Sequence, residues 1–473
     1  MDLLVKFLRR LTPEILDALY ERSPAASLVL LRAVPDLAKQ IVLRLTFIDS
    51  PLDRELLIDW FKPAYVDAFS SCIALLTQLR ILEELSDVED CDKAVRLRDT
   101  FRRSLRAALI SGQTSAASIS LATGVSQKHK KSIAQLNQYA AERWESLLQF
   151  LAICNEQTQL DVSEPTKDIL KHGGLVRDGS KRDVAVEITS IGFQFLLTDK
   201  ARQLWTYLLH AISLEHHQDD GDVVAMLTSL FRLMFLDSAQ PYAQADLHEE
   251  LLIRCREIGL IFMRKRKDGW FYVTPMIGTL TGSSVTTTIA SSSSAQNTVQ
   301  DHRFLVLETN YRVYAYTDSM LQLSILSTFC DMLYRFSNMS VGVLTRESVR
   351  NAFQVGITAE QIICYLREHA RLNAIEAAAA NVHGGKDEAN VDLVPITVAD
   401  QIRLWHLERD RFQFDDAVHY CGFDSDLDYQ RLLTYVTRNG HLLWHSDVNK
   451  MIVVRARAHD DVKLWFRKNK QAT

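Results

Sequence analysis

Residues 251–275, LLIRCREIGLIFMRKRKDGWFYVTP, decide the fold. The first nine carry apolar residues at helical spacing and end at Gly259, a residue typical of a helix C-cap. The stretches LIFMRKR and WFYVTP then alternate around Lys267, Asp268 and Gly269, as two strands joined by a turn do. The sequence therefore predicts a helix followed by a two-stranded hairpin.

The same pattern of a helix, a stop and a hairpin recurs along the chain. The other copies are residues 72–97, 167–189 and 432–456. A helix followed by a two-stranded wing is how a winged-helix domain ends. The sequence therefore predicts a mainly α chain with small β-hairpins (α+β), organised as a string of winged-helix-like modules.

Residues 301–370 predict a different unit, a small α+β module. The stretch FLVLETNYRVYAY at 304–316 alternates as two strands. The first of the helices that follow is expected to cover SMLQLSILSTFCDMLYRF at 319–336. Helices in this module are expected to begin at the capping residues Asp318, Thr345 and Thr358.

Composition suggests where the chain divides. Residues 279–300 are almost all Ser, Thr, Ala and Gly, residues 371–395 pass from alanine-rich to polar, and 112–131 have little apolar periodicity. We expect an N-terminal helical and winged-helix-like region, a winged-helix-like hub, the α+β module and a C-terminal α+β unit. Their ranges are 1–111, 132–278, 301–370 and 396–473, with linkers at 279–300 and 371–395.

Charge and composition exclude several classes of protein. The net charge is −5 over 473 residues, which argues against a chain whose whole surface coats nucleic acid. With 47% apolar residues the chain is expected to be globular, and no apolar run is long enough to predict a membrane span. The seven cysteines form no C-x-x-C pair, so we expect reduced thiols inside the cell.

No motif predicts catalysis or a cofactor. Neither a P-loop, nor G-x-G-x-x-G after a strand, nor G-x-S-x-G occurs. Residues 215–220, EHHQDD, are rich in metal-ligand types, but adjacent residues on a helix point to different faces. We therefore expect a non-enzymatic interaction protein without metal or cofactor.

Several stretches carry a resemblance to a known family. They are YAAERWE at 139–145, ITSIGFQFLL at 188–197, ETNYRVYAY at 308–316, MLYRF at 332–336 and DQIRLW at 400–405 with ERDR at 408–411. Together they resemble the fifty-two-kilodalton subunits of TFIIH, the general transcription and DNA-repair factor. The resemblance runs from the first helix to Lys468.

The resemblance implies a nuclear scaffold without catalytic activity of its own. It implies that the chain bridges the XPB translocase to the TFIIH core, through a subunit with a von Willebrand A-like domain. It also implies stimulation of the DNA-dependent ATPase of XPB, for promoter opening by RNA polymerase II and for nucleotide excision repair. Contact with DNA would be mainly indirect, through the complex.

By the same resemblance, 301–370 looks like the "clutch" module that packs against XPB, and the C-terminal unit looks like the part that pairs with the small eight-kilodalton subunit. Aromatic and arginine side chains dominate interface energetics, which selects the clutch candidates. The surface anchors expected on this ground are Tyr311, Arg312, Tyr314 and Tyr316. Arg346 and Glu347 begin the following helix and are candidates for the rim of the interface. In the C-terminal unit the hairpin 441–456 is expected to extend its sheet into the small subunit. The candidates there are Leu442, Trp444, Ile452, Val454 and Trp465.

An intramolecular packing role is an equal alternative for each of these residues, because strand side chains alternate between two faces. The runner-up function is direct binding of duplex DNA by a basic wing. Its candidates are Arg264, Lys265, Arg266 and Lys267, which could instead form a targeting signal or a solvated hairpin tip.

Overall fold

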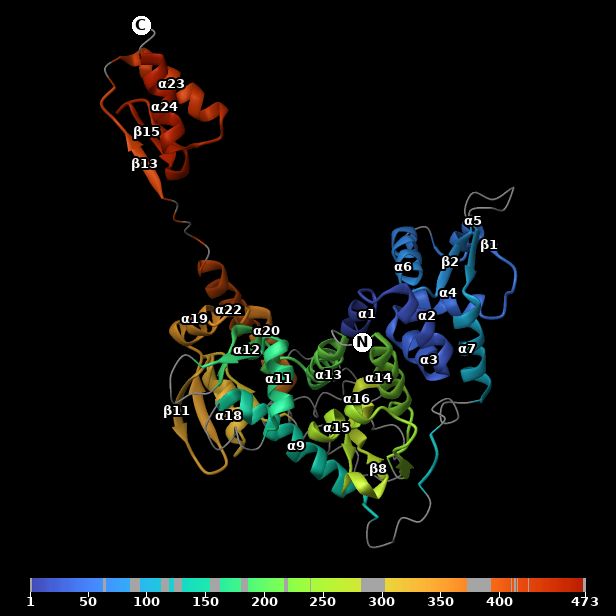
Figure 1. The fold of residues 1–473 in the computed structure, drawn as a ribbon. Coiled ribbons are helices and arrows are strands. Elements are labelled where there is room, and N and C mark those ends of the chain that lie inside the picture. The colour runs from blue at the N-terminus through green and yellow to red at the C-terminus, as the bar shows by residue number, and fades with distance from the viewer. Residues whose placement is uncertain are drawn as a thin grey trace, which may run out of the picture. The chain divides into compact units, whose positions relative to one another are not determined.

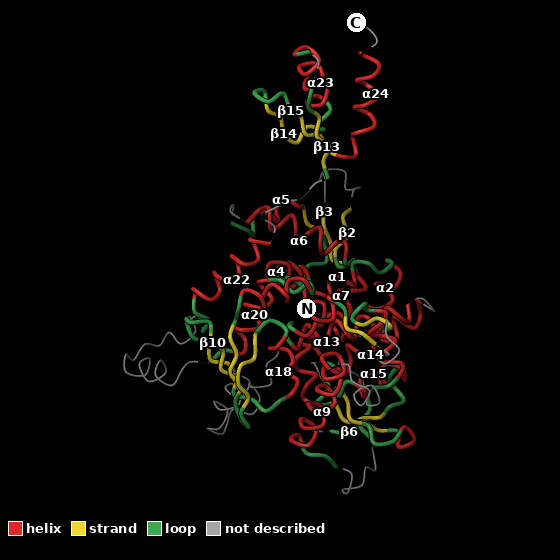
Figure 2. Tube along the Cα trace, turned by 90° about the vertical axis from the view of Figure 1, so that its left-hand side faces the viewer, coloured by secondary structure: helices red, strands yellow, loops and turns green. Residues whose placement is uncertain are grey.

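The computed structural model divides into two compact units, Met1–Arg403 and Leu404–Thr473 (Figure 1). Each unit combines helices with small antiparallel sheets (Figure 2), so the predicted mainly α class is confirmed. The structure describes residues 2–62, 65–85, 94–111, 119–122, 130–153, 162–179, 186–216, 220–238, 240–281, 303–371, 393–409, 411, 414, 416–423 and 425–470.

The first unit begins with a helical region that contains one small sheet. The strand β1 pairs with β3, which pairs in turn with β2. Proline at the first turn of α2 and of α3 fixes where those helices begin. The elements are α1 (Asp2–Leu8), α2 (Pro13–Arg22), α3 (Pro24–Ala33), α4 (Asp36–Leu45), β1 (Leu52–Asp53), α5 (Arg54–Ile58), α6 (Val66–Gln78), β2 (Leu82–Leu85), β3 (Ala94–Leu97) and α7 (Asp99–Ser111).

The region that follows, called the hub here, is built on long helices. Its elements are α9 (Ile133–Ile153), α11 (Glu164–His172), β4 (Val176–Asp178), β5 (Val186–Ile188), α12 (Ser190–Leu196), α13 (Lys200–His216), α14 (Asp220–Leu233), β6 (Pro241–Ala243), α15 (Glu249–Glu257), β7 (Ile261–Phe262), β8 (Trp270–Val273) and α16 (Gly278–Thr281), with short 3-10 turns η3 (Arg266–Asp268) and η4 (Pro275–Ile277). Thus α16 reaches into the stretch that the sequence marks as a linker.

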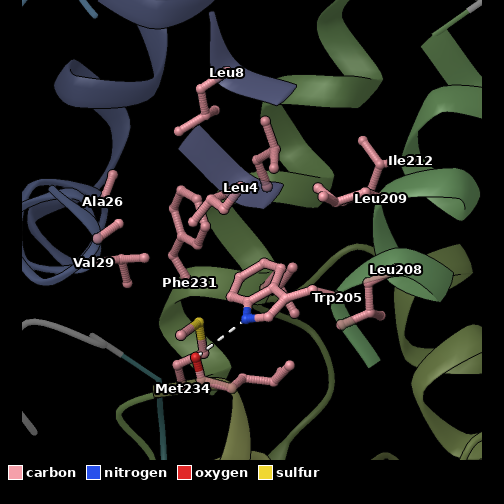
Figure 3. Close-up of a cluster of buried hydrophobic side chains, with 14 of the residues drawn as sticks. Leu4, Leu8, Ala26, Val29, Trp205, Leu208, Leu209, Ile212, Phe231 and Met234 are labelled. Atoms are coloured by element: carbon pink, nitrogen blue, oxygen red, sulfur yellow. Dashed lines mark hydrogen bonds between the residues drawn. The ribbon is translucent and has the colours of Figure 1, made fainter. Parts of the chain in front are cut away.

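One hydrophobic core joins the N-terminal region to the hub. Helix α1 packs on α13, and α14 packs on α2 and α3. Figure 3 shows Leu4 of α1 beside Phe231 of the hub, and Leu8 and Trp205 belong to the same cluster. The indole Nε1 of Trp205 donates a hydrogen bond of 3.3 Å to the carbonyl oxygen of Leu280. The burial of large apolar side chains from both regions in one cluster stabilises their mutual position.

A helix followed by an antiparallel hairpin is found at all four predicted places. The pairs are α6 with β2 and β3, α11 with β4 and β5, α15 with β7 and β8, and, in the second unit, α23 with β14 and β15. Gly259 and Gly440 stop two of these helices at φ angles of +80° and +67°, a left-handed conformation that glycine adopts readily. The winged-helix class of the modules stays a prediction.

The hub contains a three-stranded sheet in the order β6-β8-β7, called the hub sheet here. A short segment from outside the hub pairs with its β6 edge. Residues 119–122, called the closing segment here, lie along β6. The amide of Ala122 donates to the carbonyl of Pro241 at 3.0 Å, and the amide of Ala243 donates to Ser120 at 2.9 Å. This segment falls within 112–131, where the sequence predicted little structure, and the stretches 112–118 and 123–129 lie outside the described residues.

The clutch-like module has a four-stranded sheet in the order β11-β12-β10-β9. The helix predicted over 319–336 is wrong in its second half: it ends at Ser327, and Asp331–Arg335 form an edge strand instead. The predicted caps at Thr345 and Thr358 are confirmed, and both form capping boxes. The predicted cap at Asp318 is wrong, since Ser319 is the N-cap of α18. The elements are β9 (Leu305–Leu307), β10 (Arg312–Ala315), α18 (Met320–Ser327), β11 (Asp331–Arg335), β12 (Ser340–Val343), α19 (Arg346–Gln354) and α20 (Ala359–His369).

This module is seated on the hub. Helix α18 packs on α9. The side-chain amide of Gln194 donates to the carbonyl of Gly356 at 2.6 Å, and the hydroxyl of Ser319 donates to a carboxylate oxygen of Glu145 at 3.3 Å. Gly356 has φ +98° and lies so close to the hub that an added Cβ would stand 2.8 Å from the Cβ of Ser190. The seam between the two regions therefore depends on a glycine.

The second unit is a three-stranded sheet with two helices. Its strands run in the order β13-β15-β14. Its core holds Tyr429, Leu432 and Val436 of α23 against Ile452 and Val454 of β15. The elements are β13 (Ala417–Tyr420), α23 (Asp426–Arg438), β14 (Leu442–Ser446), β15 (Met451–Arg455), the 3-10 turn η7 (Ala456–Ala458) and α24 (His459–Lys470); α22 (Ile396–Arg409) precedes them.

Candidate interaction surfaces

The outer edge of β11 is open. Among the described residues, β11 pairs with β12 and with no strand on its other side. All five of its residues are exposed, and Tyr334 keeps 64% of its surface accessible. The exposed apolar side chains on and beside this strand, called the β11 surface here, are Met320, Met332, Leu333, Tyr334 and Phe336.

A groove of about 280 Å³ runs between α18 and β11. Met320 and Leu323 line it from the helix, and Met332 lines it from the strand. The hydroxyl of Ser340, also in its lining, is buried and has no hydrogen-bond partner among the described residues. Flexible thioethers adapt to varied apolar partners, so such a groove suits another chain's side chains.

Backbone irregularity shapes the same edge. The register of β11 on β12 shifts between Met332 and Tyr334, as at a β-bulge. On β12, an added Cβ at Gly342 would stand 2.5 Å from the Sγ of Cys330, so glycine lets β11 approach this strand closely. The register shift bends β11, and Gly342 of β12 allows β11 to lie close to β12.

The predicted tyrosines of the clutch divide by position. Val313 and Ala315 are buried, so Tyr314 and Tyr316 point to the opposite face of β10. Tyr314 pairs across the sheet with Val341, and so does Tyr334 of β11. Directly paired residues share a face. The structure thus brings the predicted Tyr314 to the same face as Tyr334, which the sequence reading placed in a helix.

The other clutch candidates occupy different positions. Tyr311 lies in the turn before β10 with φ +68°. The ring of Tyr316 is covered by the guanidinium of Arg371, whose Cζ lies 4.0 Å from the ring centroid. Arg312, Arg346 and Glu347 are exposed, the last two in the first turn of α19. These charged residues are placed where a partner could reach them.

The residues that the sequence reading missed are those of the β11 surface. A signal was present: Met332, Tyr334 and Phe336 alternate before Ser337 and Asn338, as in a strand that enters a turn. The continuous apolar character from Met320 onward outweighed that alternation.

In the second unit, the predicted residues fall into buried and accessible groups. Ile452 and Val454 are 0% exposed and belong to the unit's own core, and Leu442 packs against it. Trp444 pairs with Val453, so it points to the other face of the sheet, where 54% of its surface is exposed. Trp465 lies on α24 and stacks on Tyr435 with centroids 4.3 Å apart.

The basic run lies on the connection between β7 and β8. Arg264, Lys265 and Lys267 are exposed, and the side chain of Arg266 lies outside what the structure describes. The Nε of Arg264 is 3.9 Å from a carboxylate oxygen of Asp268. Contact of this tip with DNA stays a prediction.

Metal centres and membrane spans can be tested in the described part of the chain. Within that part, no three His, Cys, Asp or Glu side chains gather as metal ligands, and no helix is both long and apolar enough to cross a bilayer. Of the ligand-rich run 215–220, residues 217–219 and the side chains of the other three lie outside what the structure describes. Burial raises the pKa of the Cys255 and Cys330 thiols to about 12, so neither forms a thiolate at neutral pH.

Comparisons with known proteins agree on one family. Residues 6–372 match the family described as "Transcription factor Tfb2", and residues 400–467 match the "Transcription factor Tfb2 (p52) C-terminal domain". The chain is 32% identical over 484 residues to "General transcription and DNA repair factor IIH subunit TFB2" of Yarrowia lipolytica, covering 98% of this chain and 96% of the relative.

Two further relatives extend the match across distant organisms. "General transcription factor IIH subunit 4" of Dictyostelium discoideum is 31% identical, with 98% of each chain covered. The TFB2 subunit of Saccharomyces cerevisiae is 30% identical, with 98% of this chain and 97% of the relative covered. These names describe factor subunits and no reaction. The chain therefore belongs to the Tfb2 (p52) family of subunits of general transcription and DNA repair factor IIH.

Proposed function

We propose that this chain assembles into factor IIH in the nucleus as the scaffold that anchors the XPB translocase and stimulates its DNA-dependent ATPase. The observation that carries the proposal is the open β11 edge, with its apolar surface, on a module seated on the hub. Promoter opening and nucleotide excision repair are the processes served.

The chemistry of the β11 surface supports a protein partner. An unpaired edge strand offers a row of backbone N–H and C=O groups to a strand from another chain. Exposed Leu333, Tyr334 and Phe336 add apolar contact beside that ladder. An edge of this kind is an aggregation hazard in a lone chain, so an obligatory partner that covers it explains why it persists.

Stimulation of a partner's ATPase needs no catalytic group in this chain. It requires contacts that favour the active state of the partner over its inactive state. The seam formed by Gln194, Gly356 and Ser319 fixes the clutch-like module on the hub. A partner bound at β11 would therefore be held in a defined position relative to the rest of the first unit.

For the second unit, we infer pairing with the small eight-kilodalton subunit through the outer edge of β14. This strand is an edge of the sheet, and Leu443 and Trp444 on it are exposed. The von Willebrand A-like subunit is the third proposed partner, and the N-terminal region carries exposed apolar residues, among them Phe47 and Ile110, that suit such a contact.

Co-purification with the XPB N-terminal region tests the anchoring proposal. The full chain is compared with one that lacks 303–371, and the ATPase of full-length XPB is measured in parallel. We expect both binding and stimulation to be lost on deletion. If both persist, β11 is not the anchor. If the small subunit also fails to bind the deleted chain, the deletion has damaged the fold. The point variant L333E/Y334E then tests whether β11 is the anchor.

Direct DNA binding by the third hairpin is the second candidate, because Arg264, Lys265 and Lys267 are exposed at its tip. Neutralised phosphates release counterions, so binding through this tip would weaken steeply as salt increases. Replacing Lys265 and Lys267 by Gln would then reduce both affinity and salt slope for a duplex. A chain without measurable affinity for duplex DNA at low salt would rule this candidate out.

A further inference from the structure

The second unit carries a groove on its helical side that none of the proposed contacts uses. It has a volume of about 470 Å³ and lies between α23 and α24. Its lining includes the stacked rings of Tyr435 and Trp465, whose planes are 14° apart, and the exposed side chain of Leu427. The strand edge proposed for the small subunit lies on β14, so the groove belongs to different elements.

Charge on the groove has one sign. Arg431 and Arg438 both line it, both are exposed, and neither has an ion-pair partner among the described residues. No carboxylate belongs to the lining. A guanidinium binds a carboxylate through two parallel hydrogen bonds. It is also more weakly hydrated than an ammonium group, so it loses less hydration when a partner binds. The groove therefore complements an acidic partner.

The spacing of these residues specifies the partner further. Leu427, Arg431 and Arg438 follow one stripe of α23, since they are separated by four and seven residues. Seven residues of helix rise roughly 10 Å, so the backbone positions of Arg431 and Arg438 lie about that far apart along α23, with Tyr435 between them in the sequence. A second helix places carboxylates at the same separation when they stand at positions i and i+7, with apolar residues at i+3 and i+4 between them.

We propose that this groove binds an amphipathic helix of a partner protein whose carboxylates at i and i+7 pair with Arg431 and Arg438, and whose apolar residues cover the Tyr435–Trp465 stack. This is helix-in-groove recognition, with apolar anchors supplying affinity and charges supplying register. The occupant is separate from the strand proposed at β14, so the two can bind together.

The full chain labelled with 5-fluorotryptophan tests the proposal by 19F NMR. The probe is a helical peptide with Glu at i and i+7 and with Leu and Phe at i+3 and i+4. One comparison peptide has Gln at i and i+7, and another has the Glu residues at i and i+5. We expect the first peptide to move the Trp465 resonance and leave that of Trp444 unchanged, with affinity at least about tenfold above both comparison peptides.

Matched variants separate this site from general charge attraction. R431Q/R438Q should weaken the first peptide about tenfold or more. R455Q/R457Q removes the same two charges from exposed positions elsewhere in the unit and should change affinity less than about twofold. The proposal is overturned if both double variants weaken binding equally, if the Gln peptide binds as tightly, or if Trp465 does not respond. It is equally overturned if a DNA duplex moves the Trp465 signal and displaces the peptide.

Discussion

Two sheets of the first unit differ in whether an outer strand is paired by another segment of the chain. In the hub, β6 would be an open edge, but the closing segment 119–122 pairs with it through the amides of Ala122 and Ala243. In the clutch-like module, β9 is likewise covered, since the amide of Arg371 donates to Leu305 at 2.8 Å. Among the described residues, β11 alone of these three edges has no covering strand. The β6 edge of the hub is thus paired within the chain, whereas the β11 edge of the clutch-like module is left unpaired in the described part of the chain.

The side chains follow the same division. The covered edge of the hub is flanked by one exposed apolar residue of the closing segment, Leu121. The open edge carries the whole β11 surface. Native proteins ordinarily protect edges with charge, proline or cover, and apolar exposure on an unprotected edge marks an interaction site. The comparison therefore predicts that damage to each edge has a different consequence.

The largest effect is expected at the open edge. L333E/Y334E places two carboxylates on exposed side chains and should weaken XPB binding about 100-fold or more, as loss of interface anchors does. Pull-down with the XPB N-terminal region measures it. The control L56E/I110E changes two exposed apolar residues of the N-terminal region and should leave this binding intact. Equal loss in both variants would contradict a specific role for β11.

The second effect concerns the seam that seats the clutch-like module on the hub. G356A adds a Cβ at φ +98° and 2.8 Å from Ser190, and should reduce the free energy of unfolding by about 1–3 kcal/mol. G269A is the matched control, because Gly269 also has a left-handed φ but open space around it. Thermal unfolding should rank G356A below G269A. XPB should still bind to G356A, with weaker ATPase stimulation; unchanged stimulation would show that the seam does not transmit it.

The closed edge should respond with a smaller, local effect. A122P removes the N–H that donates to Pro241 and should cost about 1–2 kcal/mol. Hydrogen exchange at the amide of Ala243, which bonds to Ser120, should accelerate, and XPB binding should not change. A122S keeps the N–H and should behave as the parent chain does. Slow exchange at Ala243 in A122P would argue against pairing of the closing segment.

The smallest effect is expected for Glu368 of α20, which faces Asp199 of the hub. Burial, and then the charge of Asp199, raises the pKa of Glu368 above its ordinary value of 4.5. The folded state therefore holds this proton more tightly than the unfolded state, and stability falls as pH rises from about 4.5 through the raised pKa. E368Q should raise the free energy of unfolding slightly at pH 7.5, by less than about 0.5 kcal/mol, and should not raise it at pH 4. A lower stability of E368Q than of the parent chain at pH 7.5 would contradict the predicted direction of the effect.

Local signals were enough to predict the repeated helix-and-hairpin units. Gly259 and Gly440 end their helices where a left-handed residue is needed, and Thr345 and Thr358 begin theirs with capping boxes. These features depend on residues a few positions apart, so a single sequence contains them. Alternation along a strand predicts two faces but does not say which face packs in the unit's own core. Ile452 and Val454 were open between core and interface for this reason, and the structure buries them.

Features that depend on distant contacts were not predictable. β11 follows α18 without a proline or glycine between them, and Gly342, which allows β11 to approach, lies on another strand. The closing segment pairs with residues more than a hundred positions later, and its own composition contains no strand signal. The groove at Trp465 likewise exists only because α24 returns to α23.

The joined core of the first unit also fixes an order of events during translation. Leu4 and Leu8 of α1 are covered by hub helices that contain Trp205 and Phe231, about 200 residues later. At roughly 5–20 residues per second, the ribosome needs on the order of 10–40 s to supply those partners. Until then α1 lacks the hub helix α13 on which it packs. The closing segment stays unpaired until β6 has been made, which is after Phe231. The N-terminal region therefore cannot complete its core until the hub has been translated.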